Sequence, residues 1–166
     1  AQFTSRKAII SGANRGIGLT IALAYAAEGI AVALLGRNAK GIADAVNEVR
    51  TRYPAANVTS AVMDWEQPAS IAPAVEQVVQ VLGGVDILVN CAQWLAMPVP
   101  FIEQDTAHFA NMVESGLYGT VNFMQAAYPA LKRRGGSIIN MGSGAGTGGN
   151  IGQAAYGAAK EAIRGL

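Results

Sequence analysis

A tyrosine and a lysine stand four positions apart near the end of the chain, in the segment YGAAK that runs from Tyr156 to Lys160. On a helix the two side chains would lie on one face, one turn apart. A phenol is a weak acid at neutral pH, and a neighbouring ammonium group favours its phenolate form. Such a pair could donate a proton to an alkoxide as it forms. The alternatives are a plain surface pair, or a tyrosine that packs on a neighbouring subunit.

Ser143 lies thirteen residues before Tyr156, in a glycine-rich segment at residues 142–152. A hydroxyl in such a loop could donate a hydrogen bond to a substrate oxygen and fix its position. It could equally bond only to its own backbone. Together the serine, tyrosine and lysine predict chemistry at a carbonyl or alcohol oxygen.

Three glycines, Gly12, Gly16 and Gly18, occur in the segment SGANRGIG at residues 11–18. Glycines let the main chain turn sharply and approach a ligand, and the N-terminus of a following helix offers free N–H groups and a positive dipole end. No Lys followed by Ser or Thr closes the segment, so it is not a P-loop. A tight turn without a ligand is the alternative. The segment predicts a pyrophosphate-binding loop.

Apolar runs and helical patterns alternate along the chain, which predicts an α/β fold with a Rossmann-type, doubly wound parallel sheet and helices on both faces. The predicted strands are residues 7–10, 31–35, 58–63, 85–90 and 137–141. The predicted helices are residues 19–28, 39–53, 68–82 and 106–134, the last kinked or shortened by Pro129.

Ligands of such sheets bind beyond the carboxyl ends of the strands. The loops with polar or glycine-rich sequence are all predicted at that edge, at residues 11–18, 36–38, 64, 90–94 and 142–152. Their convergence favours one nucleotide site over several unrelated loops.

The chain resembles the short-chain dehydrogenase/reductase (SDR) family. The glycine spacing of residues 11–18 is similar to that of the family, VDILVNCAQ resembles its strand that ends in Asn-Asn-Ala-Gly, and YGAAK matches its Tyr-x-x-x-Lys. The resemblance covers residues 1–166 and implies a single NADP-binding Rossmann domain. It implies that Ser143, Tyr156 and Lys160 are catalytic, and that Lys160 holds the nicotinamide ribose. The expected cofactor-binding residues are Gly12, Asn14, Arg15, Gly16, Ile17, Gly18, Arg37, Asn38, Asp64, Asn90, Ala92, Tyr156 and Lys160.

The residue after the second strand distinguishes the two nicotinamide cofactors, because an acidic side chain there would bind the ribose hydroxyls of NAD. Gly36 stands at that place, and Arg37 and Arg15 could converge on a 2′-phosphate. The cofactor is therefore predicted to be NADP(H), although either arginine alone could be a solvated charge. By the resemblance Asp64 holds the adenine amino group, with a helix N-cap as the alternative.

Three departures from the family pattern stand out. Gly116 replaces the family's catalytic Asn, which is thought to hold a water behind the lysine, so the relay is either rewired through Ser115 or Asn111 or impaired. Gln93 replaces a glycine at the nicotinamide edge. The chain reaches Leu166 within the helix of the catalytic pair, so the C-terminal strands of the family are missing from this chain, and we expect it to be part of a longer polypeptide.

The leading hypothesis is an NADP(H)-dependent oxidoreductase that transfers a hydride between the nicotinamide and a ketone or secondary alcohol, with Tyr156 as general acid and base. Such an enzyme would be a carbonyl reductase or alcohol dehydrogenase. One alternative, favoured by Gly116, is a nucleotide-binding module of the same fold without turnover. Another is an epimerase or dehydratase that uses the cofactor transiently. The resemblance also implies a homodimer or homotetramer, paired through residues 106–134 and the helix of Tyr156.

The composition limits the other partners. Lys and Arg number 12 against 11 Asp and Glu, so no broad field is expected to attract nucleic acid or an anionic membrane. No apolar run reaches the roughly 18 residues of a membrane span. The single cysteine, Cys91, fits a reducing compartment, and the opening segment AQFTSRK is too polar for a secretory signal. We expect a cytoplasmic protein without a metal site.

Overall fold

The computed structural model describes residues 3–94 and 97–166; residues 1 and 2 of the polar opening segment and residues 95 and 96 lie outside the described part. Its centre is a parallel five-stranded sheet with the strand order β3-β2-β1-β4-β5. The strands are β1 (Lys7–Ser11), β2 (Ala31–Gly36), β3 (Val58–Val62), β4 (Ile87–Asn90) and β5 (Ser137–Asn140). The helices are α1 (Gly16–Ala27), α2 (Ala39–Arg52), α3 (Ile71–Leu82), α4 (Thr106–Val113), α5 (Gly119–Arg134) and α6 (Ala154–Arg164). The predicted doubly wound parallel fold is confirmed.

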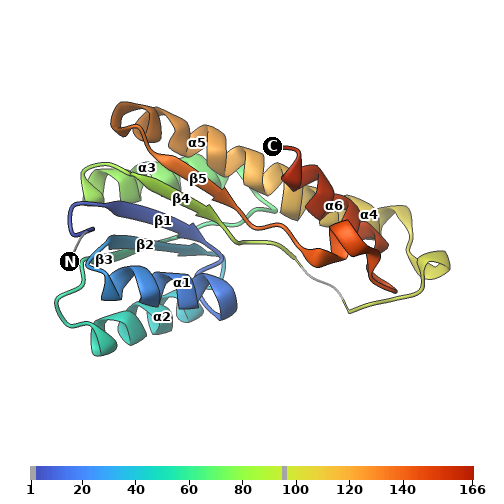
Figure 1. Ribbon diagram of the computed structural model, residues 1–166, viewed down its shortest axis with the longest axis horizontal. Coiled ribbons are helices and arrows are strands. Elements are labelled where there is room, and N and C mark those ends of the chain that lie inside the picture. Colours follow the sequence, from blue (N-terminus) through green and yellow to red (C-terminus); the bar gives the residue numbers. More distant parts are fainter. Residues whose placement is uncertain (1–2, 95–96) are drawn as a thin grey trace.

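Helices cover both faces of the sheet, so the inner strands β1, β2 and β4 are almost entirely buried. Every residue of β2 is buried, as continuously apolar strands in a two-sided sheet must be. One apolar core includes residues of α1 and α2, and the other includes residues of α3 and α5. Figure 1 shows these two layers of helices below and above the sheet. Because the chain moves outward from β1 to β3 and then returns to β4 beside β1, the sheet has a topological switch point between β1 and β4.

The first helix begins earlier than the sequence predicted. It starts at Gly16 and ends at Ala27, whereas the prediction was residues 19–28. Gly16 and Gly18 therefore lie in its first turn. Gly18 packs tightly on the preceding loop, because a Cβ on it would lie 2.5 Å from the Gly12 carbonyl oxygen. At the other end, Gly29 has a positive φ of 78°, which ends the helix as predicted.

The predicted long helix at residues 106–134 consists of α4, a π-helical turn at Glu114–Tyr118, and α5. The prediction that Pro129 shortens it is wrong, because α5 continues to Arg134. Ala127, Ala130 and Leu131 are buried in the core that α5 shares with α3, and this packing retains the last turn despite the hydrogen bond that proline cannot donate. The irregularity instead falls at Gly116, inside the π-helical turn.

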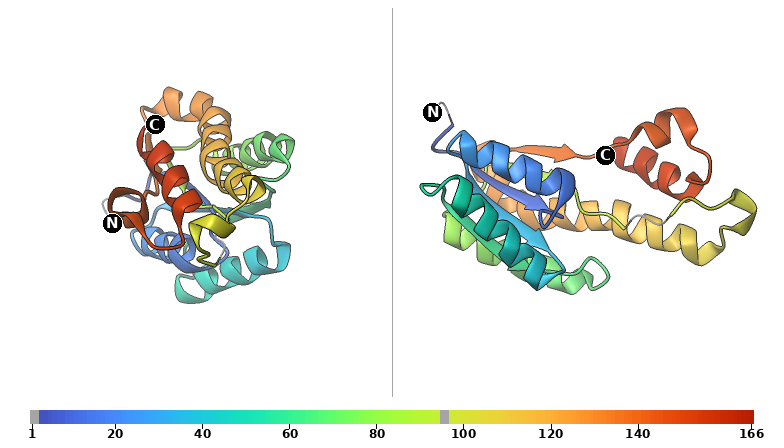
Figure 2. Two further views of the ribbon diagram at one scale, coloured as in Figure 1. Left: turned by 90° about the vertical axis from the view of Figure 1, so that its right-hand side faces the viewer. Right: turned by 90° about the horizontal axis from the view of Figure 1, so that it is seen from below.

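The last helix lies beyond the carboxyl ends of the strands. The chain leaves β5, makes a second π-helical turn at Ala145–Gly149, and enters α6, which packs on α4 and on the Glu114–Tyr118 turn. Figures 1 and 2 show α6 and α4 side by side, away from the layered body of the sheet. In the described part of the chain, no helix combines the length and the apolar character needed to cross a membrane.

Asp86, just before β4, ties together segments at the amino ends of the strands. Its side chain is 2% exposed; Oδ1 accepts a hydrogen bond from Arg134 Nε at 2.8 Å, and Oδ2 accepts one from the Lys7 backbone N–H at 2.9 Å. Arg6 adds a longer contact of 3.4 Å to Oδ1. The buried Asp86 carboxylate therefore connects the start of β1 to the end of α5 at the amino ends of the strands.

Replacing Asp86 with alanine is expected to lower the free energy of unfolding by about 2 kcal/mol, because a buried backbone N–H and a partly buried guanidinium lose their acceptor. Denaturant titration measures this loss. The matched control is Asp44→Ala, whose carboxylate pairs with Lys40 on the surface of α2 and whose removal should change stability little. An equal loss of stability in the two variants would contradict the role of the buried Asp86 carboxylate in stabilising the fold.

Candidate active site

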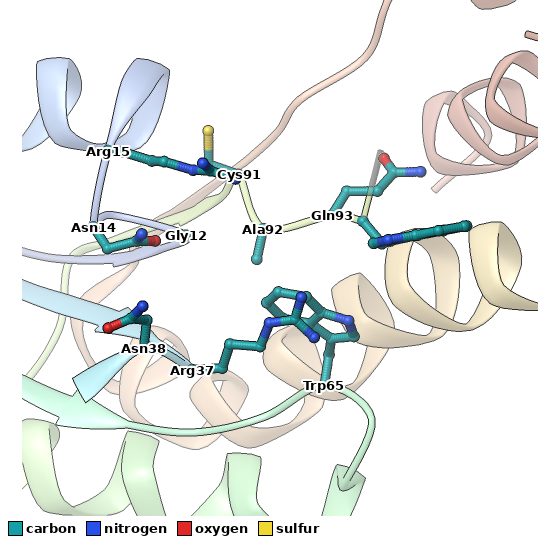
Figure 3. A pocket seen from close by; sticks show the side chains of 10 residues that line it. Gly12, Asn14, Arg15, Arg37, Asn38, Trp65, Cys91, Ala92 and Gln93 are labelled. Carbon is teal, nitrogen blue, oxygen red and sulfur yellow. The ribbon is translucent and has the colours of Figure 1, made fainter. Parts of the chain in front are cut away.

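A cleft of about 500 Å³ opens beyond the carboxyl ends of the strands, at the topological switch point. Its walls come from the loops after β1, β2, β3 and β4, as Figure 3 shows. The residues that line it are Gly12, Asn14, Arg15, Arg37, Asn38, Trp65, Cys91, Ala92, Gln93 and Trp94. The predicted convergence of four of the five loops is therefore present.

The loops after β1 and β4 touch through their backbones at the floor of the cleft. Gly12 has a φ of +68°, and a Cβ there would lie 2.8 Å from Ala92 Cα. The Ser11 hydroxyl, which is buried, accepts hydrogen bonds from the N–H groups of Cys91 and Ala92, both at 3.1 Å. Gly12 and Ala92 were predicted at the site; Ser11 was not, because a serine at a strand end carries no distinctive signal in the sequence.

The first turn of α1 points its N–H groups into this region without a side-chain cap. Its N-cap residue is Arg15, whose side chain makes no capping hydrogen bond, and no acidic residue lies in the turn. Gly16 has a φ of +56° with open space where a Cβ would stand, and Ile17 is 62% exposed. Free N–H groups and a positive dipole end form an anion site, which fits the pyrophosphate predicted for Gly12, Gly16 and Gly18.

The two arginines line the same cleft, but they do not converge. Arg37 lies over the Trp65 ring, 4.5 Å from its centroid, and pairs with Glu66 Oε1 at 2.8 Å. Figure 3 shows Arg15 on the opposite side, near Cys91. An aromatic face and a carboxylate beside Arg37 attract its guanidinium, so the convergence of the two arginines on one 2′-phosphate stays a prediction.

Trp65 is a wall of the cleft that the sequence interpretation missed. Its Nε1 is buried and has no hydrogen-bond partner among the described residues. The sequence could have indicated it, because Trp65 directly follows Asp64, which was predicted at the edge of the sheet that carries the site. A flat aromatic side chain with an unused N–H offers both a stacking surface and a donor.

Asn38 and Asp64 make local hydrogen bonds. Asn38 lines the cleft and also caps α2, its Oδ1 accepting from the Gly41 N–H at 2.8 Å. Asp64 Oδ1 accepts from the Glu66 N–H at 3.1 Å, which is a turn contact. The N-cap alternative for Asp64 is wrong, since Gln67 and Ser70 precede the next helical turns, and Asp64 is absent from the cleft lining.

Asn90 and Asn140 end the adjacent strands β4 and β5 and bond to each other. Asn90 Nδ2 donates to Asn140 Oδ1 at 2.9 Å. Asn90 Oδ1 is buried without a partner among the described residues. The pair fixes the ends of the two strands next to the segment from Cys91 to Trp94, but Asn90 does not itself line the cleft, and its role in cofactor binding stays a prediction.

Lys160 is the buried cation of this region, with 6% of its surface exposed. Its ammonium donates to the Met141 carbonyl oxygen at 2.6 Å. Burial lowers the pKa of Lys160, and the nearby Cys91 thiol opposes that change. Burial likewise raises the pKa of Cys91, and Lys160 partly offsets it. The Cys91 thiol and the Lys160 ammonium therefore interact electrostatically at the carboxyl ends of β4 and β5.

Tyr156 and Lys160 lie together on α6, as predicted from their spacing. Lys160 Nζ is 5.6 Å from the centroid of the Tyr156 ring. Tyr156 packs on an apolar cluster that contains Met112, Ala155 and Ala159 and also receives Trp94 from the loop after β4. Its apolar contacts within the described chain therefore include α4 and the loop after β4.

Ser143 lies in the segment between β5 and α6. Its Oγ accepts a hydrogen bond from the Ala145 N–H at 3.2 Å, so the local backbone bond weighed as an alternative is present. A Cβ on Gly157 would lie 2.8 Å from the Ala145 carbonyl oxygen, which places this segment directly against α6. The hydroxyl proton of Ser143 has no acceptor in the described contacts. Neither Ser143 nor the pair on α6 lines the cleft of about 500 Å³ itself.

Two of the departures from the family pattern are in contact. A Cβ on Gly116 would lie 2.6 Å from Gln93 Nε2, so the glutamine fills the space that a side chain at position 116 would need. The route through Ser115 is not supported, because its hydroxyl donates to the Asn111 carbonyl at 2.7 Å and accepts from the Trp94 N–H at 3.3 Å. Asn111 is exposed and borders a separate pocket with Glu114 and Ser115.

Comparison with known proteins agrees with this geometry. A family model described as short chain dehydrogenase matches residues 6–166. A 12alpha-hydroxysteroid dehydrogenase of Clostridium sp. is 41% identical over 169 residues, covering 99% of this chain and 65% of that protein. A 3-oxoacyl-(acyl-carrier-protein) reductase FabG of Staphylococcus aureus is 33% identical over 165 residues, covering 98% of this chain. The chain spans 65% of the length of each of these relatives.

Solved structures of the same fold include complexes with both nicotinamide cofactors. An NAD+-bound xylitol dehydrogenase has a TM-score of 0.94 at 30% identity, with 100% of this chain and 64% of that chain covered. An actinorhodin polyketide ketoreductase with NADPH has a TM-score of 0.89 at 29% identity, with 96% and 61% covered.

The lowered pKa of Lys160 makes a prediction about stability. Between that lowered pKa and the model-peptide value of 10.5, the unfolded chain binds more protons than the folded chain, so the contribution of Lys160 to stability rises with pH. In Lys160→Met this rise is expected to disappear. Unfolding free energies measured from pH 7 to 10.5 give the difference between the two proteins.

The control for this measurement is Lys132→Met, at an exposed position near the end of α5. Its pH dependence should parallel that of the unmodified protein. A Lys160→Met curve that also runs parallel would show that the buried ammonium has an ordinary proton affinity.

Proposed function

This chain belongs to the short-chain dehydrogenase/reductase family, and we propose that it forms the cofactor and catalytic site of an NADP(H)-dependent oxidoreductase acting on a ketone or secondary alcohol. The observation that carries the proposal is the pairing of Tyr156 with the buried ammonium of Lys160, on a helix that adjoins the ends of β4 and β5. The proposed enzyme is a carbonyl reductase or alcohol dehydrogenase. Its substrate is a small molecule.

The residues of the cleft fit a dinucleotide. The uncapped first turn of α1 would hold the pyrophosphate, and Trp65 and Asn38 offer polar and flat surfaces to the adenosine half. Ala92 and Asn90 would lie along the nicotinamide half, and Lys160 would donate to its ribose hydroxyls. When bound, the cofactor supplies or accepts a hydride, a chemistry that side chains do not provide.

The protein would supply orientation and the proton. Tyr156 would give its hydroxyl proton to the substrate oxygen as negative charge develops there. Lys160 would stabilise the phenolate that this leaves, because an ammonium close to the phenol ring favours its ionised form. Ser143 would donate its free hydroxyl proton to the same substrate oxygen and fix its position. In the direction of alcohol oxidation the same groups would act in reverse.

The preference for NADP(H) is supported by charge at the end of β2. Gly36 ends the strand, so no carboxylate stands where the ribose hydroxyls of NAD would need one. Arg37 and Arg15 line the cleft as two cations. The pair between Arg37 and Glu66 is 44% and 63% exposed, and such surface pairs are weak. A 2′-phosphate, a stronger bidentate acceptor, would displace Glu66 from Arg37.

Replacing Tyr156 with phenylalanine tests the catalytic assignment. Turnover is expected to fall at least about a hundredfold, the lower range for loss of a proton-transferring group, while NADPH binding stays within about twofold. The readout is the loss of NADPH absorbance with a panel of ketones, together with NADPH titration by fluorescence.

The matched control is Tyr128→Phe on α5, whose ring is 55% exposed and lies outside the site. Unchanged turnover in Tyr156→Phe would overturn the assignment. Binding of NADPH by the unmodified protein without any loss of absorbance would instead support a module without turnover.

Replacing Arg37 with alanine tests the cofactor preference. The expected result is NADPH binding weakened by about tenfold, the scale of one charge-assisted hydrogen bond, with NADH binding changed little. Arg52→Ala is the control, because Arg52 pairs with Glu48 on the outer surface of α2. An equal loss of NADH and NADPH binding would show that Arg37 does not read the 2′-phosphate.

The oligomeric state and location remain part of the proposal. Tyr118 is 57% exposed on the Glu114–Tyr118 turn, and Tyr128 is similarly exposed on α5. Exposed aromatic side chains are common in subunit interfaces, which supports a homodimer or homotetramer formed through this face. The proposed cytoplasmic location rests on the single cysteine, Cys91, which fits a reducing compartment.

A further inference from the structure

The side chain of Gln93 occupies the space that a side chain at position 116 would need. Ideal Cβ geometry on Gly116 approaches Gln93 Nε2 to 2.6 Å and Gln93 Cδ to 2.8 Å, both shorter than contacts that real Cβ atoms make. A side chain at position 116 would therefore displace the carboxamide end of Gln93 from its present position. Gly116 is itself buried within a π-helical turn, a distortion that is frequently found at functional sites.

Both polar atoms of the Gln93 carboxamide are buried, and neither has a hydrogen-bond partner in residues 3–94 or 97–166. A buried amide without partners costs a few kcal/mol, and a donor and an acceptor left open on one group suit a small polar molecule. Figure 3 shows the carboxamide turned away from Arg37 and Trp65, at the end of the cleft farthest from Asn38. The carboxamide can therefore donate and accept hydrogen bonds with a small polar molecule at that end of the cleft.

The chain neighbours of Gln93 lie close to the two groups that handle the proton. Cys91, two residues before it, interacts electrostatically with the Lys160 ammonium. Trp94, the residue after it, shares an apolar cluster with Tyr156. Lys160 donates one hydrogen bond, to the Met141 carbonyl, and an ammonium group has three donors. The site thus gathers unused donors and acceptors around one short segment.

The proposed reaction needs a path for protons in this region. Each reduction takes one proton from the Tyr156 hydroxyl, and the phenolate must recover one before the next turnover. Lys160 is 6% exposed and Ala155 and Ala159 are also buried, so bulk water does not reach the ammonium freely, whereas Tyr156 is partly exposed. A water held by buried polar groups connects such a site to solvent.

We propose that Gln93 is a positioning residue whose carboxamide holds a water molecule on the path that returns a proton to Tyr156. This inference rests on the proposed function. In each reduction the ketone gains a hydride at carbon and the Tyr156 proton at oxygen. The phenolate then takes a proton from the water chain through Lys160, and the chain recovers it from solvent, so one NADPH and one proton are consumed per alcohol formed.

Gln93→Leu is the first test, because leucine keeps most of the side-chain volume over Gly116 and removes both polar atoms. The expected result is a kcat about tenfold lower, part of the roughly 10²- to 10⁴-fold effect of proton transfer itself, with unchanged KM for the ketone and unchanged NADPH binding. Gln80→Leu is the control, since Gln80 is an exposed glutamine on α3.

A swap of the two positions is the second test, and it also reads stability. Gly116→Asn alone is expected to lower both the Tm and kcat, because the new side chain collides with Gln93. The double variant Gln93→Gly with Gly116→Asn removes the collision, and the asparagine at position 116 supplies a carboxamide in place of that of Gln93. Most of the lost Tm and kcat should return in this double variant.

The outcomes separate this inference from the proposed function. A Gln93→Leu protein with the kcat of the unmodified protein overturns the role of Gln93, as does a raised KM with unchanged kcat, which would mean substrate binding. A Gly116→Asn protein of unchanged Tm and kcat overturns the coupling of the two positions. An unmodified protein that binds NADPH but turns over no ketone or alcohol contradicts the proposed function, and this inference with it.

Discussion

The contact between the loops after β1 and β4 is the constraint on which the site depends. Gly12 lies so close to Ala92 that no side chain fits between them, and the Ser11 hydroxyl holds two N–H groups of the facing loop. This contact sets where α1 begins and therefore where its free N–H groups point. It also fixes the segment from Cys91 to Trp94, which connects the cleft to the helix that carries Tyr156.

Burial of one cation organises the other half of the site. Among the described residues, the Lys160 ammonium donates to one carbonyl, that of Met141 after β5, and burial lowers its pKa. A buried ammonium without hydrogen-bond partners is costly. The other N–H donors of Lys160 are therefore suited to bind a ligand.

The two departures at positions 93 and 116 are one structural feature rather than two. Considered singly, Gly116 indicated a lost or rewired relay and Gln93 an unexplained change beside the nicotinamide. In the fold the glutamine side chain fills the volume above the glycine, and its carboxamide has no partner among the described residues. The argument that Gly116 marks a module without turnover is weaker for this reason, because the glycine has a packing role.

The sequence by itself determined the parallel α/β fold, the edge of the sheet that carries the site, and the local pairing of Tyr156 with Lys160, because these follow from periodicity and from one helical turn. Only the tertiary structure decided what depends on distant contacts. Arg37 turned to Trp65 and Glu66 instead of toward Arg15, and α5 kept its last turn past Pro129 through core packing. Gln93 meets Gly116 across 23 positions of the chain, and no local pattern records which side chain fills the space that another leaves empty.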